Sequence, residues 1–178
     1  EEFHVPQEVR KHMKGIQEKG KEAQEEWDAL WKSYEKEYPE LVTEWNKWHN
    51  SELQADLLND ESYWQFEGAT ATRSASGEVL NRLTKYLPNM IGGSADLAPS
   101  NKTVMKGKAD FSAEDYSGSN LHFGVREHAM AAIANGMSVH GGLRPYVATF
   151  FVFCDYMKGA MRLSALMKQP VLYILTHD

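Results

Sequence analysis

The sequence contains little of what would mark a secreted, nucleic-acid-binding or membrane protein. Its one cysteine, Cys154, lies in an apolar run, which predicts a packed thiol in a reducing compartment and excludes a disulfide within the chain. Lys and Arg number 19 against 25 Asp and Glu, so no nucleic-acid partner is expected. No apolar run reaches the roughly 18 residues that a membrane-spanning helix needs, and the charged amino terminus lacks a signal-peptide core. We expect a soluble, cytoplasmic protein without a membrane partner.

An initiator methionine is also lacking, and the chain stops at "PVLYILTHD", directly after a strand-like run. A complete domain would normally continue past such a strand, so we expect a piece of a longer protein. Its 178 residues have room for one α/β domain and an appended helical segment.

The composition changes near residue 60, because most of the charge density and four of the five tryptophans lie before it. Apolar residues there recur at steps of three, four and seven, the period of one helix face. They are Val9, Met13, Ile16, Ala23, Trp27, Leu30, Trp31 and Tyr34. Pro6 fits the first turn of this helix, and Pro39 opens a second, shorter one. We interpret residues 1–60 as a helical arm whose aromatic stripe packs on a neighbouring domain; a partner-binding helical module is the alternative.

The second region, residues 61–178, has the pattern of an α/β domain. After a connector at 57–70, apolar positions predict a helix with Thr70 or Thr72 as its N-cap. Helical patterns at about 126–139 and 151–167 then alternate with the short apolar runs "NMIGG", "NLHFG", "RPYVATF" and "PVLYILT". Strands separated by helices of this length imply crossover connections. We therefore expect a mostly parallel sheet covered by helices on both faces.

Ligand-binding crevices of open parallel sheets lie at the carboxyl ends of the strands. In this chain those ends are followed by "GSADLAPSN", "GVRE", "FFVF" and "THD". Glu127 stands out there, in the first turn of a helix whose following residues carry almost no charge. A favourable interaction with the helix dipole would explain this carboxylate on structural grounds alone. The alternative is a catalytic role, since a desolvated carboxyl can share a proton near neutral pH.

Aromatic and polar residues accompany Glu127 at the same strand ends. Phe150, Phe153 and Tyr156 are spaced at i, i+3 and i+6, and such a stripe either enters the core or forms a wall for a flat heterocycle. The segment "GGSADLAPSN" favours a polar ligand loop, although it lacks the spacing of a phosphate-binding P-loop. His122 and His128 lack metal-ligand spacing, so no metal site is predicted within the chain.

These segments, in this order, resemble the pyrimidine-binding (middle) domain of transketolase, a thiamine diphosphate enzyme. The resemblance runs from about Thr72 to the end through "ATRSAS", "GGSADLAPSN", "LHFGVREHAMAAIANGMSVHGG", "YVATFFVFCDYM" and "THD". The region before residue 60 fits the linker that precedes this domain in the family. The resemblance implies transfer of a two-carbon ketol unit from a ketose phosphate to an aldose phosphate, with thiamine diphosphate and Mg²⁺ as cofactors.

The resemblance also implies roles for individual residues. Glu127 matches the family glutamate that bonds the N1′ nitrogen of the cofactor's aminopyrimidine ring. The other cofactor-binding positions are Phe153, Phe150 and Tyr156, which form the aromatic wall on that ring, and Asp96 and Leu97, which lie near the thiazolium. The positions that match contacts to the phosphate of the sugar substrate are Arg73, Ser100 and His177.

In the family, a separate amino-terminal domain holds the diphosphate and its metal ion, and the active site lies at the interface of a homodimer. We expect that domain and the carboxyl-terminal domain to lie outside this chain, which would hold about half a site and be inactive alone. Dihydroxyacetone synthase and deoxyxylulose phosphate synthase resemble this domain around the same glutamate, but "SADLAPSN" favours transketolase over the latter. A helical interaction module, supported by the tryptophan-rich arm, is the alternative from another class.

Overall fold

The computed structural model describes residues 2–50 and 59–177, and the chain divides into two compact units, Glu1–Asn46 and Lys47–Asp178. The first unit holds α1 (Gln7–Glu37) and most of α2 (Pro39–His49), the two helices that the sequence predicts. Pro6 lies at the N-cap of α1, just before the first turn in which the sequence places it, because its ψ of 148° is extended. Over the described ranges, no helix combines the length and the apolar character needed to cross a membrane.

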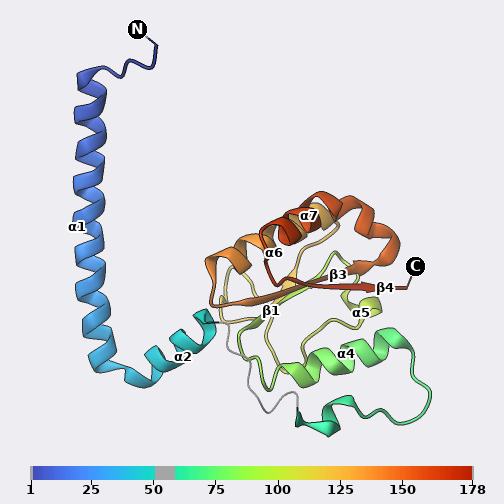
Figure 1. Ribbon diagram of the computed structural model, residues 1–178. Coiled ribbons are helices and arrows are strands. Elements are labelled where there is room, and N and C mark those ends of the chain that lie inside the picture. Colours follow the sequence, from blue (N-terminus) through green and yellow to red (C-terminus); the bar gives the residue numbers. More distant parts are fainter. Residues whose placement is uncertain (1, 51–58, 178) are drawn as a thin grey trace. The chain divides into compact units, whose positions relative to one another are not determined.

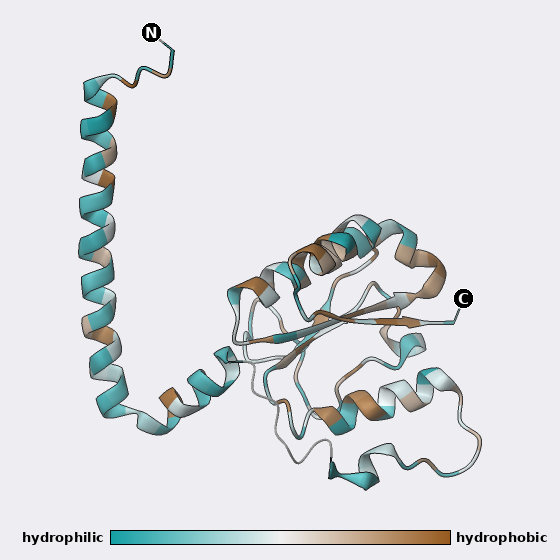
Figure 2. Cartoon of the chain, viewed as in Figure 1, coloured by the Kyte–Doolittle hydropathy of each residue, from teal (hydrophilic) through white to brown (hydrophobic). Residues whose placement is uncertain are grey.

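Aromatic rings join the two helices of the first unit. The ring centre of Trp31 in α1 lies 5.5 Å from that of Trp45 in α2 and 6.1 Å from that of Trp27. None of the residues of α1, which is described over its whole length, is buried, and Figure 2 shows a mostly hydrophilic ribbon there. This helix therefore forms from its local sequence pattern and not around a core of its own unit.

A four-stranded parallel sheet organises the second unit. Its strands are β1 (Met90–Ser94), β2 (Asn120–His122), β3 (Arg144–Phe150) and β4 (Leu172–Thr176), in the order β2-β1-β3-β4. All four coincide with the apolar runs of the sequence, so the predicted parallel sheet is confirmed. Gly92 of β1 lies between Asn120 and Tyr146, which makes β1 and β3 the central strands.

Helices cover both faces of this sheet, as the sequence predicts (Figure 1). They are α4 (Thr72–Leu83) on one face and α6 (Glu127–His140) with α7 (Lys158–Leu166) on the other. Leu80 of α4 shares a buried core with Tyr146 of β3, whereas Val147 belongs to the core under α6 and α7. Successive residues of a strand point to opposite faces, so β3 serves both cores.

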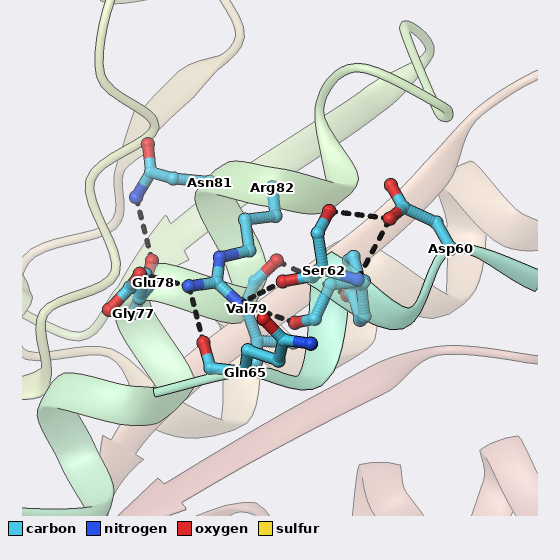
Figure 3. A network of polar contacts seen from close by, with 9 residues as sticks. Asp60, Ser62, Gln65, Gly77, Glu78, Val79, Asn81 and Arg82 are labelled. Carbon is cyan, nitrogen blue, oxygen red and sulfur yellow. Dashed lines mark hydrogen bonds and ion pairs between the residues drawn. The ribbon is translucent and has the colours of Figure 1, made fainter. Parts of the chain in front are cut away.

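Arg82 of α4 fastens the preceding segment to that helix (Figure 3). Its guanidinium donates to the carbonyl oxygens of Ser62 at 3.0 Å and Gln65 at 2.9 Å. The predicted connector, of which residues 59–70 are described, thus contains an anchored turn of 3-10 helix, η1 (Glu61–Trp64). The remaining connector residues, 57 and 58, lie outside the described residues.

The N-cap of α4 differs from the prediction. Ala71 holds this position in place of Thr70 or Thr72, and no side chain among the described residues caps the helix. The backbone N–H groups of Ser74 and Ala75 bond the Ala71 carbonyl oxygen at 2.8 and 3.0 Å, so Thr72 is already the first helical residue. The prediction was wrong because the first helical hydrogen bonds are accepted by the Ala71 carbonyl oxygen, which puts Thr70 before the N-cap and Thr72 after it.

Candidate active site

The carboxyl ends of β1, β2 and β3 surround a pocket of about 470 Å³. The neighbouring strands β1 and β3 connect to β2 and β4, which lie at opposite edges of the sheet. The two connections therefore run apart and leave a crevice between them. The lining residues are Asp96 and Leu97 after β1, Val125 and Glu127 after β2, and Phe153 and Tyr156 after β3. Sequence reasoning missed Val125, which is 75% exposed and whose side chain carries no chemical signal.

Glu127 is the first residue of α6 and is only 8% exposed. Within the part of the chain that the structure describes, no residue hydrogen-bonds or pairs with its carboxylate. The neighbouring Arg126 donates instead to the carbonyl oxygen of Phe123, at 2.9 Å. The helix amino terminus stabilises a negative charge here, but it leaves the carboxylate oxygens without bonds. Among the described residues, Thr149 Oγ1 alone is a buried side-chain oxygen without a partner, so the carboxylate oxygens of Glu127 keep accessible surface. Glu127 lines the pocket, which leaves this carboxylate open to a ligand there.

Aromatic side chains form the opposite wall. Phe150 and Phe153 stack with ring centres 5.9 Å apart and planes within 13°, and Tyr156 follows Phe153 at 6.2 Å. They are carried by β3 and by η2 (Phe151–Met157), a 3-10 helix whose three residues per turn align positions i, i+3 and i+6. The predicted helix from about 151 to 167 is present, but its first part is a 3-10 helix and α-helical geometry starts only in α7. Phe150 itself does not line the pocket but stacks on a residue that does.

A tight turn after β1 brings Asp96 and Leu97 to the pocket. Asp96 has a φ of 62°, in the left-handed region, and its N–H donates to the Ser94 carbonyl oxygen at 3.0 Å. Asp tolerates this conformation better than most residues, because its short polar side chain can bond locally. Leu97 then takes the N-cap position of the short helix α5 (Ala98–Asn101).

The predicted phosphate contacts form a second group. Arg73 Nη1 lies 2.7 Å from Nε2 of His177 and 3.5 Å from the carbonyl oxygen of Ser100. Because a guanidinium can only donate, Nε2 of the imidazole is the acceptor. The His177 ring lies edge-on to that of Phe150, with centres 4.7 Å apart, so the aromatic series connects this group to the pocket.

His122 and Cys154 make contacts away from the pocket. His122 pairs with Asp110, its Nε2 lying 3.0 Å from a carboxylate oxygen. Cys154 is half-buried and packs against the core under α6 and α7. Residues 2–50 and 59–177 contain no cluster of three or more His, Cys, Asp or Glu that could hold a metal ion.

Comparison with known families decides where this site belongs. Residues 68–178, more than half of the chain, match the family model described as transketolase, pyrimidine binding domain. The chain belongs to the transketolase family. Residues 1–54 match a second model, transketolase, thiamine diphosphate binding domain. This match corrects the expectation that the diphosphate-binding domain lies wholly outside the chain, since the helical arm falls within its model.

Transketolases are similar to this chain over its whole length. The transketolase of Halalkalibacterium halodurans is 48% identical over 99% of this chain and 27% of that protein, and the chloroplastic transketolase of Spinacia oleracea is 45% identical over 100% and 24%. A crystal structure of Pichia stipitis transketolase in complex with sedoheptulose 7-phosphate matches with a TM-score of 0.87 at 38% identity, covering 100% of this chain and 27% of that chain. The chain thus spans about a quarter of the length of its curated transketolase relatives.

Proposed function

We propose that this chain forms the pyrimidine-binding half of a thiamine diphosphate site. The intact enzyme would transfer a two-carbon ketol unit from a ketose phosphate to an aldose phosphate. The observation that carries this proposal is the unpartnered carboxylate of Glu127, a residue only 8% exposed that shares a pocket with the aromatic side chains of Phe153 and Tyr156. Membership of the transketolase family supports the same assignment.

The residues around the pocket fit a flat heterocycle that carries a protonatable nitrogen. Phe153 would offer a ring face for stacking, and Glu127 would hold a proton at the N1′ atom of the aminopyrimidine. Asp96 and Leu97, fixed by the turn after β1, would bound the pocket on the thiazolium side. When bound, thiamine diphosphate supplies the carbanion chemistry that breaks and forms carbon–carbon bonds.

Arg73, Ser100 and His177 would bind the phosphate of the sugar substrate. A guanidinium recognises phosphate through two parallel N–H bonds, which suits a residue already held at 2.7 Å from the imidazole. The edge contact between His177 and Phe150 would place this phosphate site at the outer end of the aromatic wall. The pocket would then hold the aminopyrimidine ring of the cofactor, and the cluster would hold the phosphate end of the sugar substrate.

The rest of the site would come from other parts of the full-length enzyme. We propose that Mg²⁺ and the diphosphate are held mainly by the diphosphate-binding domain, and that a homodimer completes the active site. The chain alone should be inactive. A reducing compartment suits the half-buried Cys154, and we propose the cytoplasm, although the named plant relatives are chloroplastic.

The test compares Glu127→Gln with Glu114→Gln in the full-length enzyme. Glu127→Gln keeps the shape of the side chain but cannot hold the proton, so turnover of xylulose 5-phosphate with ribose 5-phosphate should fall by about 10²–10⁴-fold. Glu114 is exposed and lines none of the pocket, so its variant should keep full turnover. Unchanged turnover in Glu127→Gln would refute the proposal. Turnover with formaldehyde in place of ribose 5-phosphate would instead assign the enzyme as a dihydroxyacetone synthase.

A further inference from the structure

A buried polar chain joins the segments that carry the proposed phosphate contacts. Asn101 is fully buried; its Nδ2 donates to Ser94 Oγ at 2.9 Å, and its Oδ1 accepts from Thr176 Oγ1 at 2.6 Å. Ser94 Oγ lies 2.8 Å from Thr103 Oγ1, and the Tyr146 hydroxyl donates to the Thr103 carbonyl oxygen at 2.7 Å. Burial raises the pKa of the Tyr146 phenol, which keeps this hydroxyl a donor.

Asn101 connects elements that the sheet itself does not connect. Ser94 is the last residue of β1, Asn101 the last of α5 and Thr176 the last of β4, while β3 lies between β1 and β4. Backbone ladders fix each strand against its neighbour, but they end where the strands end. The Asn101 amide therefore sets how α5 lies relative to the ends of two strands that do not pair.

The residues next to this bridge in sequence are the ones that face Arg73. Ser100 precedes Asn101, and His177 follows Thr176. Arg73 Nη1 lies 3.5 Å from the Ser100 carbonyl oxygen and 2.7 Å from His177 Nε2. Any shift between Asn101 and Thr176 would consequently change the distance that Arg73 spans.

We propose that Asn101 is a positioning residue that holds Ser100 and His177 at the spacing required to bind a sugar phosphate. This inference rests on the proposed function, because it takes the phosphate role of the Arg73 cluster as given. Burial of an amide is tolerated only when its polar atoms are bonded, and an apolar residue could fill the same space. What the amide adds is directed bonds: its N–H donates to Ser94 Oγ and its oxygen accepts from Thr176 Oγ1, and both bonds weaken when their angles change.

The test compares Asn101→Ala with Asn135→Ala in the full-length enzyme. Asn135 is also buried; it donates to the Ala160 carbonyl oxygen at 2.9 Å and accepts from Ser164 Oγ, about two helical turns along α6 from Glu127. Both variants lose one donated and one accepted bond, so both should lower the thermal midpoint to a similar extent. Only Asn101→Ala should lower the ratio of kcat/KM for xylulose 5-phosphate to kcat/KM for unphosphorylated xylulose. We expect a loss of roughly tenfold to hundredfold, because a small misplacement of the phosphate-binding groups has an effect of this size.

A second pair of variants removes a single hydroxyl. Thr176→Val deletes the bond to Asn101, whereas Thr149→Val deletes a buried hydroxyl that has no partner among the described residues. We expect Thr176→Val to reduce the preference for the phosphorylated sugar less than Asn101→Ala does, and Thr149→Val to keep it. This pair decides the question even if Asn101→Ala does not fold.

Arg73→Ala separates the inference from the proposed function. If this variant keeps the preference for the phosphorylated sugar, the phosphate cluster is wrongly assigned and the proposed function fails at that point. If it loses the preference while Asn101→Ala and Thr176→Val keep it, the positioning role is overturned and the proposed function stands. Equal losses for the two sugars in Asn101→Ala would also overturn it, because a purely structural residue would give that result.

Discussion

The two units of this chain are stabilised by different kinds of contact. α1 is a 31-residue helix with no buried residue, supported by exposed i, i+4 pairs such as Lys21 with Glu25 at 3.6 Å, which contribute little. β3, by contrast, has five consecutive buried residues and takes part in the cores of both sheet faces. Short-range pattern is enough for the first unit, whereas the second depends on contacts between distant segments. All the proposed site residues lie in the second.

The first unit still carries an apolar surface. Trp27, Leu30, Trp31, Tyr34 and Trp45 line a hollow of about 290 Å³, and Leu30 is 63% exposed. Within this unit the aromatic stripe packs on itself, as the Trp31–Trp45 contact demonstrates. These five residues would form the contact surface whether the helical arm packs on a neighbouring domain or binds a partner protein.

The sharpest contrast between the units should come from glycine. A Cβ at Gly93 in β1 would lie 1.9 Å from the carbonyl oxygen of Leu121, whereas one at Gly20 in α1 would meet nothing within 4 Å. Gly93→Ala should lower the free energy of unfolding of the full-length protein by about 3 kcal/mol or more, because a neighbouring backbone cannot yield. Gly20→Ala should raise it by about 0.5–1 kcal/mol. Denaturant titration followed by circular dichroism measures both, and equal effects would erase the contrast.

The next largest effect should come from leucine truncation. Leu80 is 2% exposed in the core under α4, so Leu80→Ala should cost about 2–5 kcal/mol. Leu30→Ala should change stability by no more than about 0.5 kcal/mol if its face is free in the full-length protein. An equal loss at Leu30 would mean that another part of the protein covers that face, which would sharpen the comparison in favour of domain packing.

The smallest effect should appear in acid. Hydrogen bonds from Ser62 and then from Tyr86 lower the pKa of Asp60 below its ordinary value of 3.8. A lowered pKa in the folded state contributes stability at higher pH, and this contribution is lost as the pH falls from about 4 through the folded value. Asp60→Asn should therefore flatten the loss of thermal midpoint in that window, and Tyr86→Phe should reproduce part of the change. The same acid profile in all three proteins would contradict the role of this carboxylate.

Much of the fold was predictable because its signals are local. The four strands lie in short, mostly apolar runs that contain or border glycine or proline, and the helices between them carry the period of one face. The 3-10 type of the helix at 151–157 was not predictable, since over seven residues a period of three cannot be distinguished from one of 3.6. Likewise, the N-cap of α4 could not be chosen among adjacent residues without the backbone geometry.

The part of the site that lies at the carboxyl ends of the strands was predictable from the sequence. The rule that ligands bind at the carboxyl ends of parallel strands selects the segments that hold Glu127, Asp96 and Phe153. The Arg73–His177 contact joins residues 104 positions apart and came only from the family resemblance. Asn101 counts in the sequence only as one of the polar groups of "GGSADLAPSN", and its bridging role could not be predicted because its partner Thr176 lies 75 positions later.

The 3-10 winding of η2 has a consequence for engineering. An α-helical turn advances 100° per residue, so rewinding this segment would rotate each successive aromatic by about 60° for every three residues. The side chains of Phe150, Phe153 and Tyr156 would then point in different directions around the helix axis. Their rings would no longer form one stacked series. Substitutions between them that favour the wider coil could thus dismantle the aromatic wall while every ring stays in the sequence.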